Sequence, residues 1–323
     1  MKAAVFRKYG PPDVLTIEDV EKPAPGDDEV LVRVHATTVC TPDWRFRSAK
    51  PFFFIRPMIG LRRPAKKFNI LGLEFAGQVE QVGAKVSRFA VGDRVFGSTG
   101  FKMGAHAQYV CVPEYRGLAK TPDAVTDEQA AAIPFGGISA LHFLRRAKVA
   151  AGQKVLIYGA SGSVGTYAVQ LAKHFGAHVT AVCSTANLDL VRSLGADHAI
   201  DYTKEDFSSD GRIYDVVFDA VGKTHARQSV RPLKRGGFYV LVGANLSAIL
   251  GGIWLKLSGA GRLIGGMARA LPGDLDLLGR LVAAGKVSPV IGRRFALDEI
   301  AEAHRYAESG HKRGNAVVIT EEK

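Results

Sequence analysis

The twelve residues KVLIYGASGSVG, at positions 154–165, decide the fold of this chain. The apolar run at 155–158 is typical of a buried β-strand, and residues 164–175 are compatible with a helix. Between them stand three glycines, Gly159, Gly162 and Gly165. In this setting the second glycine lets backbone N–H groups approach a pyrophosphate, and the third lets the helix pack closely on the strand. The stretch therefore predicts a dinucleotide-binding site, and a glycine-rich turn without a ligand is the alternative.

The composition is that of an ordinary globular protein. The 323 residues are enough for two domains, and 47% of them are hydrophobic while 23% are charged. The 43 basic and 31 acidic residues give a net charge of +12, which is compatible with a nucleic acid, an anionic membrane surface or an anionic ligand. Because the basic residues are scattered outside positions 56–67, we expect a solvated surface and no nucleic-acid partner.

The cysteines and the apolar segments bear on where the protein is found. Cys40, Cys111 and Cys183 are too few to form a disulfide framework, and such a set suits a reducing compartment. The first residues lack the basic-then-apolar plan of a signal peptide, and no stretch of about 18 apolar residues is free of charge. We therefore expect a cytoplasmic protein without a transmembrane helix.

The pattern of elements changes near Pro122. Before it, short β-branched runs separated by prolines and glycines indicate a β-rich domain; after it, strands and helices alternate, which indicates parallel strands with helices on both faces. A final strand, helix and strand within 290–320 are expected to rejoin the β-rich domain. We predict an α/β fold in which a Rossmann-type, doubly wound parallel sheet at 122–269 accompanies a β-rich domain at 1–121, completed by 270–323.

Four further stretches carry a resemblance to a known family. They read KAAVFRKYGPPDVL at 2–15, GLEFAGQVEQVG at 72–83 and VGDRVFG at 91–97, and AAAIPFGGISAL precedes the glycine loop at 130–141. Together with the loop, they resemble the medium-chain dehydrogenase/reductase superfamily, and its zinc-independent, quinone oxidoreductase-like branch most of all. The resemblance implies that the β-rich domain is a GroES-like substrate domain and that the active site lies between the two domains. It also implies a homodimer formed through edge strands of the nucleotide domain.

The zinc ligands of other members of this superfamily are not matched here. Zinc-dependent relatives use a cysteine, a histidine beside a glutamate, and a third cysteine or histidine. Cys40 stands at the first place, but Leu73 precedes Glu74 at the second, and residues 133–135 read Ile-Pro-Phe at the third. A catalytic zinc needs three protein ligands and a water, so we expect no metal and a structural role for Glu74. Cys40 is then either a reactive, substrate-contacting residue or a small buried one.

The choice of cofactor depends on the residues after the second strand of the nucleotide domain. An NAD site places a carboxylate about 20 residues past the glycine loop, to bond the ribose 2′-hydroxyl. Here residues 183–185 read Cys-Ser-Thr, and Asp189 falls later, in the next helix. A missing acid favours NADPH, whose 2′-phosphate Ser184, Thr185 and Asn187 are able to bond, although relatives often carry lysine at the last place.

Other cofactor contacts follow from the loop or from the resemblance. From the loop we expect Gly159, Ser161, Gly162, Ser163, Val164 and Gly165 to contact the cofactor. The resemblance adds Tyr202 beside the 2′-phosphate, Ser139 and Gly243 near the nicotinamide, and Asn315 from the other domain. Packing of the Tyr202 ring on the sheet, and turn or capping roles for the other three residues, are the alternatives.

Without a metal, the reaction best suited to this chain is hydride transfer to a quinone or an activated double bond. The negative charge that develops on the substrate oxygen needs a donor. Relatives often carry an asparagine and a tyrosine in the segment matching 39–48; Cys40 and Arg45 replace them, and Asp43 is kept. Arg45, Cys40 and Asp43 are therefore the candidate catalytic residues. Arg45 either donates to substrate, or pairs with Asp43 or faces solvent.

An unusual segment at 50–68, KPFFFIRPMIGLRRPAKKF, combines phenylalanines with basic residues and prolines. It is interpreted as a lid, as a patch that rests on an anionic membrane, or as a long surface loop. For the whole chain we predict an NADPH-dependent, zinc-independent reductase of quinones or α,β-unsaturated carbonyl compounds. The alternatives are an NAD(P)-dependent alcohol or aldehyde oxidoreductase, and a non-catalytic NADPH-binding sensor or interaction protein.

Overall fold

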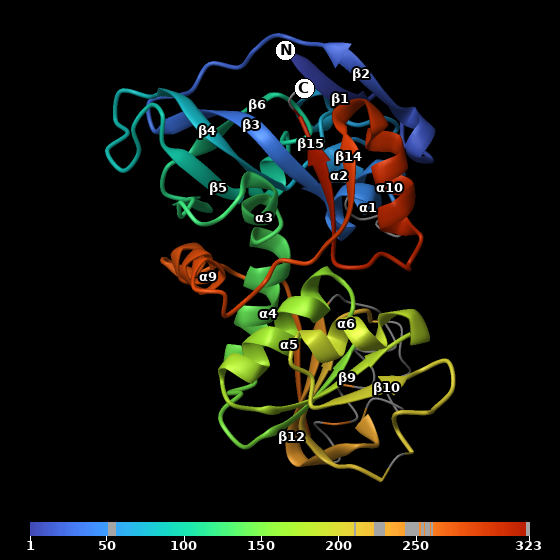
Figure 1. Ribbon diagram of the computed structural model, residues 1–323. Helices are drawn as coiled ribbons and strands as arrows, with labels where there is room; N and C mark the ends of the chain where they lie inside the picture. Colours follow the sequence, from blue (N-terminus) through green and yellow to red (C-terminus); the bar gives the residue numbers. More distant parts are fainter. Residues whose placement is uncertain are drawn as a thin grey trace. The chain divides into compact units, whose positions relative to one another are not determined.

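The computed structural model describes residues 1–50, 56–209, 211–222, 230–242, 252, 255, 259 and 261–320. The chain divides into two compact units (Figure 1). Unit 1 comprises Met1–Phe135, Pro272–Ala283 and Pro289–Lys323, and unit 2 comprises Gly136–Leu271 and Ala284–Ser288. The domain boundaries expected from the sequence, 1–121 with 270–323 and 122–269, stay a proposal beside this division.

Unit 2 is built on a six-stranded parallel sheet. Its strands lie in the order β10-β9-β8-β11-β12-β13, and each pair of neighbours is parallel. They are β8 (Lys154–Tyr158), β9 (His178–Cys183), β10 (His198–Asp201), β11 (Tyr214–Asp219), β12 (Leu233–Val242) and β13 (Gly261–Gly266). The order reverses between β8 and β11, and folds of this kind bind ligands outside the carboxyl ends of the strands at such a point.

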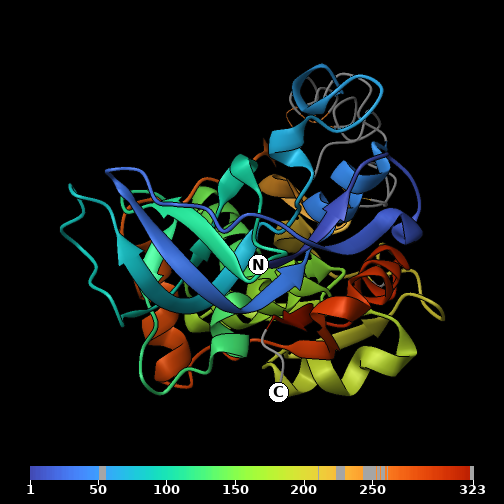
Figure 2. The same cartoon turned by 90° about the horizontal axis from the view of Figure 1, so that it is seen from above.

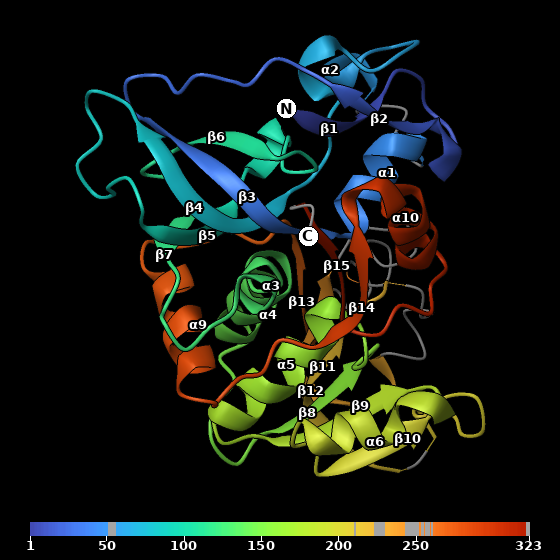
Figure 3. The ribbon, with the colours of Figure 1, turned by 45° about the horizontal axis from the view of Figure 1, so that its top comes forward.

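The helices described in unit 2 follow the sheet closely. They are α4 (Pro134–Arg146), which begins with the last two residues of unit 1, α5 (Ser163–His174) and α6 (Leu188–Ser193). Helix α5 contacts β8 and β9, and Figure 3 shows α5 and α6 lying along the sheet. The strand and the helix predicted on either side of the glycine loop are confirmed as β8 and α5. The middle residues of β8 are fully buried, as expected for a parallel strand covered on both faces.

Unit 1 is built on a seven-stranded sheet. Its strands lie in the order β14-β15-β3-β4-β5-β7, and β6 pairs with β3. Figure 2 shows the long strand β3 crossing the unit. The strands are β3 (Glu29–Val39), β4 (Glu74–Val82), β5 (Arg94–Ser98), β6 (Tyr109–Pro113), β7 (Leu118–Lys120), β14 (Ile291–Ala296) and β15 (Asn315–Ile319). Strands β1 (Lys2–Phe6) and β2 (Leu15–Asp19) form a separate antiparallel pair. Because β14 and β15 join β3, the expectation that the last strands rejoin the β-rich part is confirmed.

Five α-helices of unit 1 lie in the described part of the chain. They are α1 (Thr41–Ser48), α2 (Arg56–Ile59), α3 (Asp127–Ala131), α9 (Asp274–Ala283) and α10 (Ile300–Glu308). Phe6, Phe46, Phe295 and Val318 belong to one buried cluster that joins both ends of the chain in unit 1. Within the described ranges, none of the helices is long and apolar enough to cross a membrane. A β-rich unit and a parallel-sheet unit together confirm the predicted fold class.

Candidate functional site

The glycine loop forms a tight turn between β8 and α5. Gly159 has a φ of +77°, which favours glycine, and its N–H donates to the Val182 carbonyl at 3.0 Å. A Cβ on Gly165 would lie 2.1 Å from the Gly159 carbonyl oxygen, whereas a Cβ on Gly162 would meet nothing nearer than that same oxygen, at 3.5 Å. Gly165 is therefore required by packing within the protein. Gly162 is not required by packing, so the space above it is open to a ligand.

The N-terminus of α5 provides donors for an anion. Gly162 is the N-cap and has no side chain with which to cap, and the first turn carries no acidic residue. The first N–H groups of a helix lack partners within the helix, and the helix dipole adds positive potential there. Ser163 and Val164 are buried in that turn, and Ser161 is partly exposed beside it. The loop residues thus fit the pyrophosphate of a dinucleotide.

The residues predicted to bind a 2′-phosphate lie together at the carboxyl ends of β9 and β10. Ser184 begins the 3₁₀ turn Thr185–Asn187, and its Oγ accepts from Asn187 Nδ2 at 3.1 Å. The Tyr202 N–H donates to the Cys183 carbonyl at 3.1 Å, and its side chain is 44% exposed. The Tyr202 ring lies 6.1 Å from that of Tyr158, so it also packs on the end of β8.

A carboxylate that sequence reasoning missed lies in the same place. Asp201 ends β10 and is buried; it accepts hydrogen bonds from the hydroxyls of Thr185 and Thr203. These hydrogen bonds, the Thr185 bond first, hold the pKa of Asp201 below its ordinary value, so the group is ionised. The ammonium of Lys204 lies 3.9 Å from it. The signal in the sequence was the segment HAIDY at 198–202, in which only Tyr202 was predicted to lie beside the cofactor.

The other predicted cofactor residues are spread over the two units. Ser139 lies buried in α4 of unit 2. Asn315 begins β15 of unit 1, where it is buried and its Nδ2 donates to the Val290 carbonyl at 3.1 Å. Gly243 lies outside the described residues. The cofactor roles of all three stay predictions.

The three candidate catalytic residues begin α1 at the end of β3. Asp43 is fully buried, and its carboxylate accepts from the Cys40 N–H at 2.8 Å, the Cys40 thiol at 3.0 Å and the Gly72 N–H at 3.1 Å. Asp43 therefore fixes the start of α1 to the segment before β4. The Arg45 guanidinium lies 5.4 Å from the centre of the Trp44 ring, and partial burial lowers its pKa.

Cys40 lacks the surroundings of a reactive thiol. The residue is buried, and burial raises the pKa of its thiol well above the ordinary value; the nearby carboxyl groups of Asp43 and Glu74 add to this shift. A reactive cysteine needs positive surroundings that stabilise the thiolate. These contacts favour the interpretation of Cys40 as a small buried residue.

Glu74 is buried at the start of β4. Its carboxyl group accepts from the Phe135 N–H at 2.6 Å and from the Thr38 hydroxyl, and the Thr37 hydroxyl donates to its backbone carbonyl at 2.6 Å. Burial raises the pKa of Glu74 to about 7, although the two hydrogen bonds to the carboxyl group act in the opposite direction. Glu74 thus connects β3, β4 and the start of α4, as a structural role requires.

Lys312 is the residue near this cluster that sequence reasoning missed. It precedes β15, and its Nζ lies 3.3 Å from the Val39 carbonyl oxygen, to which it donates. Burial lowers the pKa of the ammonium, while Cys40, Glu74 and Asp43 act in the opposite direction. The sequence carries only a weak signal for it, because Lys312 stands in the run His-Lys-Arg at 311–313 and nothing there sets it apart.

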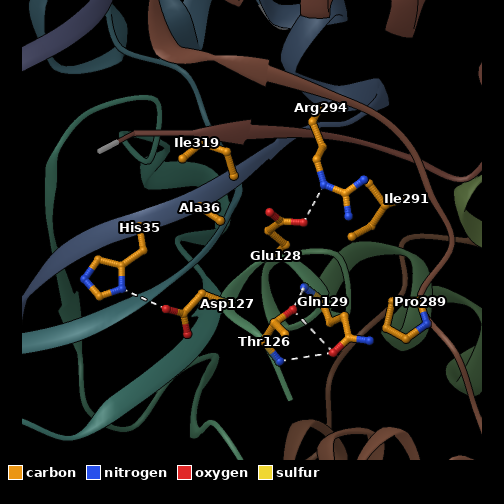
Figure 4. A pocket seen from close by; sticks show the side chains of 10 residues that line it. All are labelled: His35, Ala36, Thr126, Asp127, Glu128, Gln129, Pro289, Ile291, Arg294 and Ile319. Atoms are coloured by element: carbon orange, nitrogen blue, oxygen red, sulfur yellow. Dashed lines mark hydrogen bonds and ion pairs between the residues drawn. The ribbon is translucent and has the colours of Figure 1, made fainter. Parts of the chain in front are cut away.

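A pocket of about 560 Å³ lies elsewhere in unit 1 (Figure 4). His35 and Asp127 face each other there with 2.8 Å between Nδ1 and Oδ2, and Arg294 donates to Glu128 at 2.6 Å. The carboxylates of Asp127 and Glu128 thus have partners within the pocket. The pocket contains none of the residues predicted from the sequence.

The segment at 50–68 is described only in part. Residues 51–55, which include three of its four phenylalanines, lie outside the described residues. Leu61 is 67% exposed, and the basic side chains of Arg62, Arg63 and Lys66 are exposed as well, whereas Ile59 belongs to the core of unit 1. The lid, membrane and surface-loop interpretations all stay open.

Comparison with known proteins identifies the family. The model of the alcohol dehydrogenase GroES-like domain matches residues 26–123, and that of the zinc-binding dehydrogenase matches 194–318. A quinone oxidoreductase of Pseudomonas aeruginosa is 34% identical over 336 residues, which cover 98% of this chain and 99% of that protein. The chain belongs to the medium-chain dehydrogenase/reductase superfamily. It lies in the quinone oxidoreductase-like branch of that superfamily, as the resemblance indicated.

Two further relatives of this superfamily member cover nearly all of the chain. The NADPH-dependent alkenal/one oxidoreductase of Arabidopsis thaliana chloroplasts is 34% identical over 333 residues, which are 98% of this chain and 79% of that protein. The structure of the quinone oxidoreductase from Coxiella burnetii superposes with a TM-score of 0.90 at 33% identity, covering 99% of each chain. The resemblance therefore extends over both units.

One matched family model is described as a zinc-binding dehydrogenase, which raises the question of whether residues near Cys40 are able to bind zinc. Near Cys40 the chain offers Asp43 and Glu74, and Asp43 already accepts three hydrogen bonds within the protein. The Lys312 ammonium adds a positive charge to the same surroundings. Across the part of the chain that the structure describes, no group of three histidine, cysteine, aspartate or glutamate residues is arranged to hold a metal ion. This donor set does not fit a catalytic zinc.

Proposed function

We propose that this chain is an oxidoreductase that uses NADPH to reduce quinones or α,β-unsaturated carbonyl compounds. The observation that carries the proposal is the glycine loop, in which Gly165 is required by packing and Gly162 leaves open space at the N-terminus of α5. The names of the relatives support the reaction: one is a quinone oxidoreductase and another an NADPH-dependent alkenal/one oxidoreductase.

The chain's own residues would hold the cofactor in two places. The N–H groups at the start of α5 would bond the pyrophosphate, with Ser161, Ser163 and Val164 beside it. Ser184, Asn187 and Tyr202 would contact the 2′-phosphate, and the Lys204 ammonium would offset the charge of Asp201. When bound, NADPH supplies the hydride. Proposed contacts of Ser139, Gly243 and Asn315 with the nicotinamide side rest on the family resemblance.

We propose that Arg45 contacts the substrate. Its side chain is partly buried at the start of α1, and a guanidinium is able to donate two parallel hydrogen bonds to a carbonyl or carboxylate. Asp43 would act by fixing α1, and Cys40 by filling space beside it.

Arg45→Ala is expected to lower kcat/KM at least tenfold, because the guanidinium that contacts the substrate is lost. The affinity for NADPH is expected to stay unchanged, because Arg45 is not among the residues proposed to hold the cofactor. Steady-state kinetics with a quinone, together with a fluorescence titration of NADPH, measure both quantities. An unchanged kcat/KM would remove Arg45 from the reaction.

The proposed function is tested first by cofactor binding. Protein treated with a chelator is titrated with NADPH and with NADH, following fluorescence, and then screened with quinones and enones by NADPH absorbance. Tighter binding of NADPH and turnover without metal would support the proposal. Loss of activity on chelation would instead favour an alcohol or aldehyde oxidoreductase. NADPH binding without turnover of any acceptor would favour a sensor or interaction protein.

Three further statements about the protein belong to the same proposal. A cytoplasmic location is supported by its three cysteines, Cys40, Cys111 and Cys183, all of which are free thiols. A homodimer is supported by the family resemblance and by the edge strands of the parallel sheet. Contact with an anionic membrane through the segment at 50–68 would appear as sedimentation with anionic liposomes at low salt, and no such sedimentation would exclude it.

A further inference from the structure

Lys312 owes its position to the pairing of strands that are distant in the sequence. Strand β15 runs antiparallel to β3, with Ala316 opposite Val39. The residues just before β15 therefore extend beyond the end of β3, where α1 begins. There the Lys312 Nζ donates to the Val39 carbonyl at 3.3 Å, and Lys312 as a residue is only partly buried. The sheet thus places an ammonium beside Cys40.

The surroundings of this ammonium are acidic. Three groups act on it electrostatically: Cys40 and Asp43 from the start of α1, and Glu74 from the start of β4. In return, Lys312 favours the ionised forms of Cys40 and Glu74. Burial opposes the charge of the ammonium and has the larger effect on its pKa. Lys312 is therefore an ammonium that lies near acidic groups, and it gives up its proton more readily than an ordinary lysine does.

Position 40 lacks the neutral donor that the family resemblance leads us to expect there. Relatives resembling this chain often carry asparagine where Cys40 stands, and an amide is able to donate to a substrate oxygen. The Cys40 thiol is buried, and it donates to Asp43 at 3.0 Å. The Val39 carbonyl that precedes it accepts from Lys312. A charged donor therefore lies next to the position where a neutral one has been lost, and charged donors form the stronger hydrogen bonds.

We propose that Lys312 is a catalytic residue of the reductase, whose ammonium donates a hydrogen bond and then a proton to the carbonyl oxygen of the substrate. This inference rests on the proposed function. For an enone, bound NADPH would supply the hydride for a C–H bond at the β-carbon, and the π electrons of the enone would shift toward its oxygen. The oxygen takes the proton from Lys312, giving an enol that becomes the saturated ketone. The neutral amine recovers its proton from water before the next turnover.

The kinetic test uses two variants of Lys312 and one control. Lys312→Met removes the charge and is expected to lower kcat about 10²–10³-fold, as the loss of one donor to a developing oxyanion does. Lys312→Arg keeps the charge but does not release its proton near neutral pH. Lys85→Met is the control, because Lys85 is an exposed lysine of unit 1 that pairs with Asp27. The control is expected to keep wild-type kcat, and all variants are expected to bind NADPH within about twofold of wild type.

The pH profile separates catalysis from a purely structural role. In the wild type, kcat is expected to fall as the pH rises through the pKa of the ammonium, because the proton donor is then lost. Lys312→Arg is expected to be slower than wild type and to lose this alkaline decline. If either variant retains wild-type kcat, or if Lys312→Arg retains the alkaline decline, the proposal for Lys312 is wrong. Wild-type protein inactive on every acceptor would overturn the proposed function, and the role of Lys312 with it.

A measurement without turnover completes the test. Lysines of the wild-type protein are methylated with ¹³C-formaldehyde, and the signal of Lys312 is assigned by its absence in Lys312→Arg. Its NMR titration is expected to give a pKa below the ordinary value of a lysine. If Lys312 titrates at or above that ordinary value, it lacks the buried surroundings on which the proposal depends.

Discussion

The fold disfavours the ionised form of the Glu74 carboxyl group. The group is buried, and its pKa is raised to about 7 from an ordinary value of 4.5. A raised pKa in the folded state means that the folded protein holds this proton more tightly than the unfolded chain does. The stabilising effect is complete below pH 4.5 and is lost as the pH rises through about 7. The difference corresponds to about 3 kcal/mol.

Glu74→Gln is expected to remove this dependence, because the amide stays neutral and its oxygen still accepts from the Phe135 N–H. The Tm of the variant minus that of the wild type should be several degrees larger at pH 8.5 than at pH 5.5. Glu80→Gln is the control on the same strand, since Glu80 is exposed and ionised at both pH values. An equal difference in Tm at the two pH values would show that Glu74 does not titrate between them.

Residues differ in how far the sequence reveals them. The loop glycines were found because strand, glycines and helix are consecutive in the chain. Lys312 was missed because its surroundings come from the register of β15 on β3, which places it beside residues some 270 positions away. Asp201 was missed for a related reason: the sequence places it at the end of a strand, but only the sheet brings that end beside Thr185.

At the scale of elements, two glycines between β8 and α5 have different surroundings. A Cβ on Gly165 would lie 2.1 Å from the Gly159 carbonyl oxygen and 2.7 Å from the Ala160 Cα, and neither backbone atom is free to move away. Gly162 has a φ of −79° and a ψ of 175°, which any residue adopts, with open space around it. Gly165 is therefore required by packing, whereas packing does not require a glycine at position 162.

Two alanine substitutions separate packing from cofactor binding. Gly165→Ala is expected to destabilise the protein by about 1–3 kcal/mol, through overpacking between β8 and α5. Gly162→Ala is expected to keep the wild-type Tm and to weaken NADPH binding at least tenfold, because the methyl group occupies the approach of the pyrophosphate. Circular dichroism and a fluorescence titration measure the two effects. Wild-type affinity in Gly162→Ala would mean that the loop is a turn without a ligand.

At the scale of the whole molecule, the sequence shows the order of the elements, whereas contacts between distant segments are not visible in it. The change of pattern near Pro122 was visible, because alternating strands and helices begin there. The return of Ala284–Ser288 to unit 2 was not visible, because it depends on contacts with distant residues. One such contact is the hydrogen bond from the Ser288 N–H to Gln170 Oε1 at 2.6 Å. Contacts between distant segments set such boundaries, and local pattern carries no record of them.

The parallel sheet of unit 2 ends in strands whose outer sides have no neighbour among the described strands. β13 (Gly261–Gly266) is one edge and β10 the other. The outer N–H and C=O groups of an edge strand are able to pair with another chain. With the family resemblance, this leads us to expect a homodimer with twice the mass of 34.6 kDa, measured by light scattering.

Gly265→Lys tests whether β13 forms the dimer. A Cβ at Gly265 fits, with the nearest atom, the Leu241 carbonyl oxygen, at 3.6 Å, so the substitution is expected to leave the fold intact. A lysine on an edge strand disfavours pairing with a second strand, so the variant should be a monomer with an unchanged circular dichroism spectrum. A variant that stays dimeric would place the interface on another surface, and a monomeric wild type would exclude the dimer altogether.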